Sequence, residues 1–272
     1  MAPAPFPARF PVHPMERDPS EPTTDPGAMA PWPDRFPDHQ WELYREAIAE
    51  LRNGAVPFLL GGAFGFAAHT GIWRNTKDLD LYVLPRDRDA AVEALGRAGF
   101  ADYHPEKPYD RRWIYRSHRD GVILDIIWSM ANLRASVDEA WFRRARPVRV
   151  REEELLAVPA EELIWSKLYI VQRDRCDWPD ILNVLQAAGP TLDWDHLLGR
   201  VGGDGVLLAG VLSVFRWLCR DEAGSITDAV IERARRAGEA AGAAGDGRRR
   251  ADLLDSRAWF PYHQGVAGMP GP

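Results

Sequence analysis

The sequence predicts an α/β protein, with α and β elements in its first part and helices alone in its second. Between residues 38 and 150, short apolar runs of strand length alternate with amphipathic segments of helical spacing. From about residue 151, the periodic segments all have helical spacing. We therefore expect a mixed sheet with flanking helices at residues 38–150, followed by a helical part at residues 151–240.

Composition limits the possible classes of protein. The chain has 272 residues, of which 46% are hydrophobic and 27% charged, as expected of a globular protein with a substantial core. A formal net charge of −6 argues against a tight, sequence-independent nucleic-acid binder. Cys176 and Cys219 lack the spacing of a metal site and are expected to be reduced thiols. Because the sequence shows neither an export pattern nor an apolar run of about eighteen residues, we expect a cytoplasmic protein with no membrane partner.

Both ends of the chain have compositions that do not favour a packed core. Residues 1–37 hold eleven of the 22 prolines, which is typical of a disordered extension. Residues 241–272 are expected to form a linker and tail, because their first part is rich in glycine, alanine and arginine.

The elements between these ends follow from local patterns. Trp41, Tyr44, Ile48 and Leu51 form a stripe of helical spacing, and Asp38 is a suitable N-cap for that helix. Asp120-Gly121 separates two strand-like runs and is typical of a hairpin turn. Strands are expected at residues 56–60, 79–84, 112–117, 122–128 and 147–150. Further helices are expected at residues 64–69, 87–97, 160–173, 177–188, 193–200, 204–220 and about 225–240.

Three aspartates lie in the predicted strands. Asp78 and Asp80 are separated by one leucine and follow the glycine pair Gly61-Gly62. Because side chains alternate along a strand, Asp78 and Asp80 should share one face. Asp125 lies in the run VILDIIW, where a lone buried carboxylate would be unstable unless it were paired, hydrogen-bonded or bound to a metal.

Three converging acids beside a glycine turn favour a site for metal and phosphate. Mg²⁺ (or Mn²⁺) prefers hard oxygen ligands and commonly takes one or two carboxylates together with substrate phosphates. Two such ions, roughly 3.5–4 Å apart, can stabilise both the attacking and the leaving oxygen of a phosphoryl displacement. A glycine turn can bring backbone N–H groups close to phosphates.

Two other interpretations stay open. Asp78 could cap a turn, Asp80 could be solvated and Asp125 could pair with an arginine. A dinucleotide site also places an acid roughly 20 residues after a glycine turn. The chain, however, has G-G-x-x-G in place of G-x-G-x-x-G, and its acids form a pair on a strand.

The glycine pair, the segment Asp78-Leu79-Asp80-Leu81 and a third acid on a later strand resemble the DNA-polymerase-β-like nucleotidyltransferase superfamily. The resemblance covers roughly residues 40–190. It is closer to the bacterial branch of toxin-type, abortive-infection and uncharacterised small nucleotidyltransferases. That branch reads glycine pair, helix, His-Gly, Arg-x-Thr and then the acid pair. This chain has His69 and Gly71 with Thr70 inserted between them, followed by Arg74 and Thr76.

The resemblance implies transfer of a nucleoside monophosphate from a nucleoside triphosphate to an acceptor, with release of pyrophosphate. It implies that Asp78 and Asp80 hold the metals, and that Asp125 completes the metal site and helps to deprotonate the acceptor. Gly61 and Gly62 would cradle the triphosphate through the backbone. Many active members have serine after glycine, whereas Ala63 provides no hydroxyl here.

Four further residues are candidates for contact with the nucleotide. Arg74, Thr76 and Lys77 precede the acid strand, where a cation could neutralise phosphate charge, and Lys167 lies on a later helix. Thr76 is expected mainly to fix the turn, and either lysine could instead be solvated.

Other polar residues are expected to have structural roles. His69 lies at a helix end, where a polar side chain can satisfy free carbonyl groups. Arg173, Arg175, Asp177 and Asp180 are expected to form ion pairs that dock the helical part.

The acceptor is open, since an RNA end, a protein hydroxyl and a small molecule suit the same metal chemistry. Two other functions are considered. The missing serine hydroxyl motivates a nucleotide-binding or interaction module without turnover. The toxin-type branch implies a toxin component with an antitoxin partner.

Overall fold

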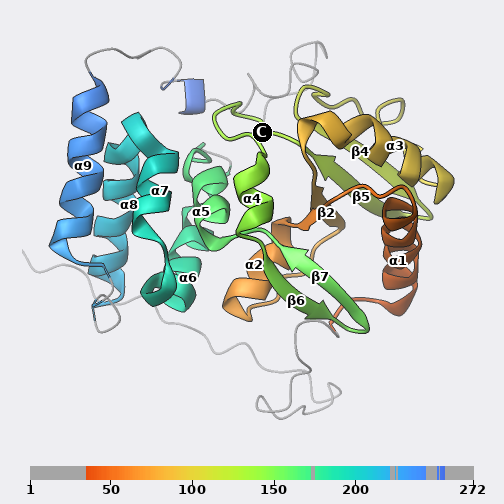
Figure 1. The fold of residues 1–272 in the computed structure, drawn as a ribbon, viewed down its shortest axis with the longest axis horizontal. Helices are drawn as coiled ribbons and strands as arrows, with labels where there is room; N and C mark the ends of the chain where they lie inside the picture. Colours follow the sequence, from red (N-terminus) through yellow and green to blue (C-terminus); the bar gives the residue numbers. More distant parts are fainter. Residues whose placement is uncertain are drawn as a thin grey trace, which may run out of the picture. The chain divides into compact units, whose positions relative to one another are not determined.

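The strands form one seven-stranded mixed sheet in the order β3-β4-β5-β2-β1-β7-β6, which confirms the α/β class (Figure 1). The computed structural model describes residues 35–172, 175–220, 224, 226–242, 250 and 252–254. Most of the predicted N-terminal extension and C-terminal tail lies outside these residues. Cys176 and Cys219 are free thiols, as predicted.

The sheet combines parallel and antiparallel pairs. Its strands are β1 (Leu59–Leu60), β2 (Asp78–Tyr82), β3 (Ala101–Asp102), β4 (Ile114–Arg119), β5 (Val122–Ile127), β6 (Arg146–Val150) and β7 (Glu153–Ala157). β2 pairs with β5 and β1 pairs with β7 in parallel, and the other neighbours are antiparallel. Asp120 and Gly121 join β4 to β5 with φ values of 50° and 78°, which confirms the predicted hairpin.

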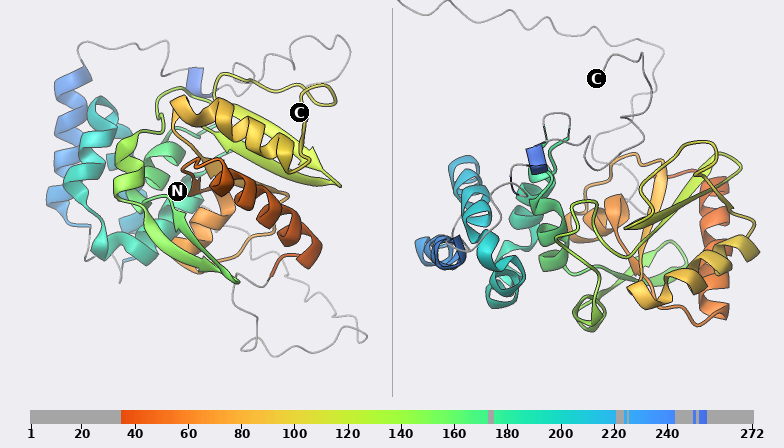
Figure 2. Two further views of the ribbon diagram at one scale, coloured as in Figure 1. Left: turned by 45° about the vertical axis from the view of Figure 1, so that its right-hand side comes forward. Right: turned by 90° about the horizontal axis from the view of Figure 1, so that it is seen from above.

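Helices cover the sheet and then continue away from it. They are α1 (Asp38–Asn53), α2 (Gly62–Thr70), α3 (Arg88–Arg97), α4 (Glu139–Arg143), α5 (Ala160–Leu168), α6 (Trp178–Ala188), α7 (Trp194–Val201), α8 (Gly205–Leu218) and α9 (Asp228–Gly242). Figure 1 shows α5 and α6 between the strands and the group α7, α8 and α9. Figure 2 shows α1 and α3 side by side against the strands, where both contact β5.

Several predicted boundaries were wrong for local reasons. The N-cap of α1 is Pro37, and the Asp38 carboxylate pairs with Arg151 instead. β1 starts only at Leu59, because the Val56 N–H donates back to the Leu51 carbonyl rather than to a neighbouring strand.

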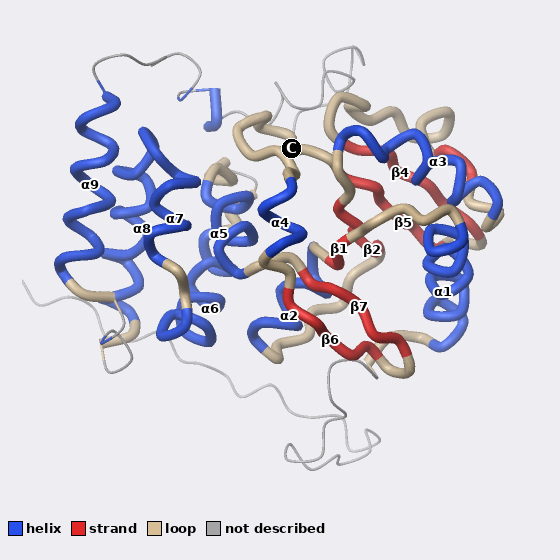
Figure 3. The backbone as a smooth tube through the Cα atoms, in the orientation of Figure 1, coloured by secondary structure: helices blue, strands red, loops and turns tan. Residues whose placement is uncertain are grey.

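The region from residue 150 to residue 177 also differs from the prediction. β7 was not predicted, yet it pairs with β1 and β6, so the strands continue beyond residue 150 (Figure 3). The helix predicted at residues 160–173 ends at Leu168. There the chain turns back, and Val171 forms an isolated antiparallel bridge with Cys176. Strand β3 and helix α4 were not predicted either.

Alternation along β2 and β5 separates an apolar face from the face that carries the acids. Leu79, Leu81, Leu124 and Ile126 are buried in one core together with side chains of α1 and α3. The alternate positions of both strands point to the other face of the sheet. The prediction that Asp78 and Asp80 share one face is therefore confirmed, and Asp125 lies on the same face.

One segment of the described chain, Trp194–Leu218, is long and apolar enough to cross a membrane by length and composition alone. It is divided into α7, a 3₁₀ turn at Gly202–Asp204 and α8. Leu197, Leu208 and Leu212 of this segment are fully buried in the core that spans the helical part. Other apolar side chains of the segment, among them Val206, Trp217 and Leu218, are exposed.

Close packing of α8 against α9 depends on a glycine, which leads to the first prediction. A Cβ at Gly205 would lie 2.1 Å from the backbone oxygen of Ala234. We expect Gly205→Ala to destabilise the protein by about 1–3 kcal/mol, because the two backbones must separate. Thermal or denaturant unfolding measures this loss.

Gly199→Ala in α7 is the matched control. A Cβ at Gly199 would meet no other atom within 4 Å. This variant should be neutral or more stable by up to about 1 kcal/mol, because alanine favours helix over glycine. Equal stability of the two variants would contradict the close packing of α8 and α9.

Candidate active site

A cavity of about 330 Å³ lies between one face of the sheet and the α5–α6 region. Seven predicted site residues line it, and they come from the start of α2, the segment before β2, the strands β2 and β5, and α5. These residues are Gly62, Arg74, Thr76, Asp78, Asp80, Asp125 and Lys167. Gly61 and Lys77 are not among the lining residues, and the Lys77 side chain is exposed.

The pairing of β2 with β5 brings the three acids together. Asp80 and Asp125 are register partners on these parallel neighbours, and Asp78 precedes Asp80 on the same face. One carboxylate oxygen from each acid lies within 4.8 Å of the other two. The Asp125 side chain is only 1% exposed, so its charge requires a partner.

Arg116, which was not among the predicted site residues, is that partner. Its Nε donates to both carboxylate oxygens of Asp125 at 2.9 and 3.1 Å. Its Nη2 donates to Asp125 and also lies 3.3 Å from Asp78 Oδ2. The alternative in which Asp125 pairs with an arginine is therefore correct. The three acids nevertheless converge, so the two interpretations do not exclude each other.

A sequence signal for Arg116 did exist. The two-residue turn at Asp120-Gly121 fixes the register of the hairpin, and this register places Arg116 directly opposite Asp125. Opposite charges at directly opposed positions of an antiparallel pair stabilise each other.

Burial and mutual repulsion both disfavour ionisation of the acids. Burial raises the pKa of Asp125 to about 6, although the bond from Arg116 opposes this shift and the charge of Asp78 adds to it. Burial, followed by the charges of Asp78 and Asp125, raises the pKa of Asp80 well above its usual value. The hydrogen bond to Asp125 raises the pKa of Arg116, which stays charged. A bound cation would relieve the repulsion among the carboxylates.

The glycine pair is required by close packing on β2. Gly62 begins α2 with φ of +51°, and a Cβ there would lie 1.7 Å from Asp80 Oδ2. A Cβ at Gly61 would lie 2.8 Å from the Tyr82 ring, and the Gly61 N–H donates to the Asp80 carbonyl at 2.9 Å. The Gly61 N–H is thus already used within the fold, whereas Gly62 faces the cavity.

Thr76 and His69 contact their own surroundings. The Thr76 hydroxyl donates to Asp78 Oδ1 at 2.6 Å, as a turn-fixing role requires. His69 Nε2 lies 2.7 Å from the Val158 carbonyl, which ties the end of α2 to the residue after β7. Burial lowers the pKa of His69, although the contact with Val158 opposes this shift. His69 thus has a structural contact, but with the Val158 carbonyl rather than with the free carbonyls of its own helix end.

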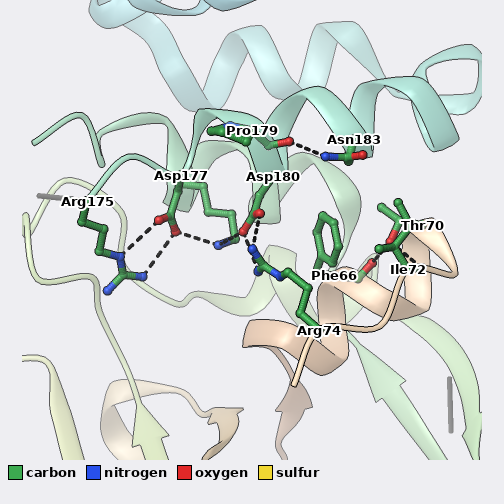
Figure 4. A network of polar contacts seen from close by, with 10 residues as sticks. Phe66, Thr70, Ile72, Arg74, Arg175, Asp177, Pro179, Asp180 and Asn183 are labelled. Carbon is green, nitrogen blue, oxygen red and sulfur yellow. Dashed lines mark hydrogen bonds and ion pairs between the residues drawn. The ribbon is translucent and has the colours of Figure 1, made fainter. Parts of the chain in front are cut away.

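A network of ion pairs joins the segment before β2 to α5 and α6 (Figure 4). Arg74 forms a two-pronged pair with Asp180 at 2.6 and 2.8 Å. Lys167 Nζ lies 2.8 Å from Asp180 and 2.7 Å from Asp177, and Arg175 also pairs with Asp177 at 3.1 Å. The expected pairing of Arg175 with Asp177 is confirmed. Arg74 and Lys167, which were predicted to contact the nucleotide, also belong to this network.

Burial opposes ionisation of Asp177, but Lys167 and Arg175 outweigh that effect and lower its pKa. The network therefore consists of three cations and two carboxylates, a formal charge of +1. Arg173, the fourth residue of this expectation, lies outside the described residues.

Comparison with known proteins identifies a matching family. A family model described as uncharacterised nucleotidyltransferase matches residues 43–206. No curated protein matches the chain significantly.

Solved structures give weaker likenesses. The antibiotic-resistance factor ANT(2'')-Ia is 18% identical over 67% of this chain and 96% of its own, with a TM-score of 0.45. The lincosamide antibiotic adenylyltransferase LnuA is 15% identical over 55% and 96%, with a TM-score of 0.39. JHP933 from Helicobacter pylori is 16% identical over 84% and 99%, with a TM-score of 0.36. Such likenesses do not identify a substrate.

The contact between Gly62 and Asp80 gives the second prediction. Gly62→Ala should displace the Asp80 carboxylate or the start of α2, because the added methyl group cannot fit beside Oδ2. We expect a loss of about 2–4 kcal/mol, which combines overpacking with backbone strain at positive φ. Chemical denaturation measures the loss.

Gly71→Ala separates strain from contact. Gly71 also has positive φ, at +71°, but a Cβ there would meet nothing within 4 Å. This control should lose only the strain contribution, on the order of 1 kcal/mol. If it destabilised the protein as much as Gly62→Ala, the packing role of Gly62 would be wrong.

The ion-pair network gives the third prediction. The side chains of Asp180 and Lys167 are 8% and 11% exposed, so Asp180→Asn leaves cations without their buried partner. We expect a loss of about 2–4 kcal/mol in the free energy of unfolding.

Asp195→Asn is the matched control, because Asp195 forms an exposed pair with Arg233. An exposed pair contributes less than about 1 kcal/mol. Denaturant unfolding of both variants tests the difference, and similar losses would show that the network is not a buried anchor.

Proposed function

The chain belongs to a family of nucleotidyltransferases, and we propose that it transfers a nucleoside monophosphate from a nucleoside triphosphate to a hydroxyl-bearing acceptor. An acceptor oxygen bonds to the α-phosphorus, the bond from that phosphorus to the oxygen bridging to the β-phosphate breaks, and pyrophosphate leaves. The acceptor hydroxyl gives its proton to the Asp125 carboxylate, which lines the same cavity. The observation that carries this proposal is the convergence of Asp78, Asp80 and Asp125 beside Gly62.

The donor set fits a hard divalent cation. Three carboxylate oxygens within 4.8 Å of one another suit Mg²⁺ or Mn²⁺, and none of the residues described as lining the cavity is a cysteine or histidine. Asp78, Asp80 and Asp125 would hold the ion. When bound, it would supply Lewis-acid stabilisation of charge on the phosphoryl oxygens.

The cations of the cavity are suited to a triphosphate. Lys167, Arg175 and Arg74 line the cavity, and their carboxylate partners Asp177 and Asp180 hold them in position. Positive groups that are fixed before the substrate arrives need little reorganisation to stabilise phosphate charge. We assign these three residues to the triphosphate side of the cavity.

The apolar part of the cavity offers room for an uncharged group. Its members include Trp113, Ile114, Ile127, Met130 and Ile170. A nucleobase or part of an acceptor fits a surface of this kind. An RNA end, a protein hydroxyl and a small hydroxylated molecule would meet the same reacting centre, so the assay must offer all three.

The fourth prediction tests the reaction. Purified protein is incubated with Mg²⁺, each labelled nucleoside triphosphate, total RNA and cell lysate, and transferred label and pyrophosphate are measured. Asp78→Asn combined with Asp80→Asn should reduce transfer by at least about 100-fold, because the metal ligands are lost. Chelation of Mg²⁺ in the parent should have the same effect.

Asp120→Asn is the matched control. Asp120 is exposed on the β4–β5 turn, and its positive φ of 50° suits asparagine. This variant should keep the parent rate. A doubly substituted Asp78/Asp80 variant as active as the parent would contradict the proposed mechanism.

A second candidate function is nucleotide binding without turnover. Ala63 follows Gly62 and gives the cavity no hydroxyl at the position where serine is common in active members. Calorimetry with ATP and Mg²⁺, followed by a pyrophosphate assay with the acceptor mixture, separates the two. Binding without pyrophosphate release would favour the module.

A further inference from the structure

Arg116 has a position that metal ligation and phosphate contact do not account for. It lies on β4, opposite Asp125 on β5, and Asp125 in turn lies beside Asp80 on β2. These three register partners form one row across the sheet. Their side chains all line the cavity.

We propose that Arg116 is a built-in counter-cation of the three acids, which holds Asp78 and Asp125 in place before a divalent cation binds and competes with that cation for their oxygens. This inference rests on the proposed function, because it assumes that the three acids bind a metal. It assigns Arg116 a positioning role that also sets metal affinity.

The hydrogen bonds of Arg116 connect two acids on different strands. The guanidinium binds Asp125 through both Nε and Nη2, and the same Nη2 lies 3.3 Å from Asp78 Oδ2. One nitrogen thus bridges the two carboxylates. A fork-shaped guanidinium can make these contacts at once, whereas a lysine ammonium has no such geometry.

Compensation of the acids is uneven. Asp125 and Asp78 accept hydrogen bonds from Arg116, and Asp78 also accepts one from the Thr76 hydroxyl. Among the described residues, no side chain donates a hydrogen bond to the Asp80 carboxylate. Asp80 therefore offers its oxygens to an incoming cation, while the other two acids are already ordered.

Competition follows from shared oxygens. An ion held by all three acids must take oxygens from Asp78 and Asp125, and Arg116 already contacts both. A guanidinium and a divalent ion at such short range repel each other. The Arg116 side chain is 30% exposed, so its guanidinium has access to water when it gives up these contacts.

The test compares Arg116→Gln with Arg119→Gln. Both arginines lie on β4, but Arg119 pairs with Glu46 and does not line the described cavity. Unfolding temperature is measured in a chelator, and the Mn²⁺ dissociation constant is measured by calorimetry without nucleotide. A third variant, Arg116→Lys, keeps the charge but loses the fork.

Arg116→Gln should unfold at a lower temperature in chelator, bind Mn²⁺ about tenfold more tightly and gain more stability from Mn²⁺ than the parent. Arg119→Gln should bind Mn²⁺ as the parent does. Arg116→Lys should fall between the parent and Arg116→Gln in affinity.

Unchanged or weaker Mn²⁺ binding by Arg116→Gln would overturn the counter-cation role. In that case the metal site itself would still stand if the parent binds Mn²⁺ and Asp80→Asn does not. A different result would count against the metal site itself: the parent binds no Mn²⁺, or it binds Mn²⁺ as strongly as Asp80→Asn does. In that case the metal basis of the proposed function would fail, and this inference with it. The two failures therefore give different results.

Discussion

The parallel pairing of β2 with β5 is the constraint on which the site depends. It sets Asp80 beside Asp125, so two carboxylates lie next to each other on one face. The opposite face fixes the register, because the leucines of β2 and the apolar neighbours of Asp125 are buried under α1 and α3. A slip of one residue would turn these apolar side chains toward the cavity and bury the acids. The acids are therefore positioned by the core behind them.

The crowded charge on this face accounts for several neighbouring residues. Arg116 compensates Asp125, and the Thr76 hydroxyl orients Asp78. Gly62 is needed because the Asp80 carboxylate occupies the space of its missing side chain. The sequence predicted Gly62 as a phosphate-binding residue, and the structure shows that packing against Asp80 also requires glycine at this position. The two roles are compatible, since Gly62 also lines the cavity.

Local patterns predicted the features that depend on neighbouring residues. The two-residue period of a strand gave the shared face of the acids, and Asp120-Gly121 gave the hairpin that carries Arg116 and Asp125. β7 was missed because its sequence, EELLA, is poor in the residues that favour strands. Pairs such as Arg74 with Asp180 join residues 106 positions apart, and no local pattern reveals which cation meets which acid. Lys167 could therefore be named as a nucleotide contact and the two aspartates as ion-pair residues, but the pairing of Lys167 with both of them could not be predicted.

The cavity contains two charged clusters that are each paired internally. The acids of β2 and β5 are compensated by Arg116, and the cations Arg74, Lys167 and Arg175 are compensated by Asp177 and Asp180. When all groups are ionised, the three acids with Arg116 carry a formal charge of −2, and the second cluster carries +1. Under the proposed function, a free cation complements only the first cluster and a free triphosphate only the second. A metal-bound triphosphate presents both signs to one cavity, so it complements both clusters at once, and neither internal pairing has to be lost without a replacement.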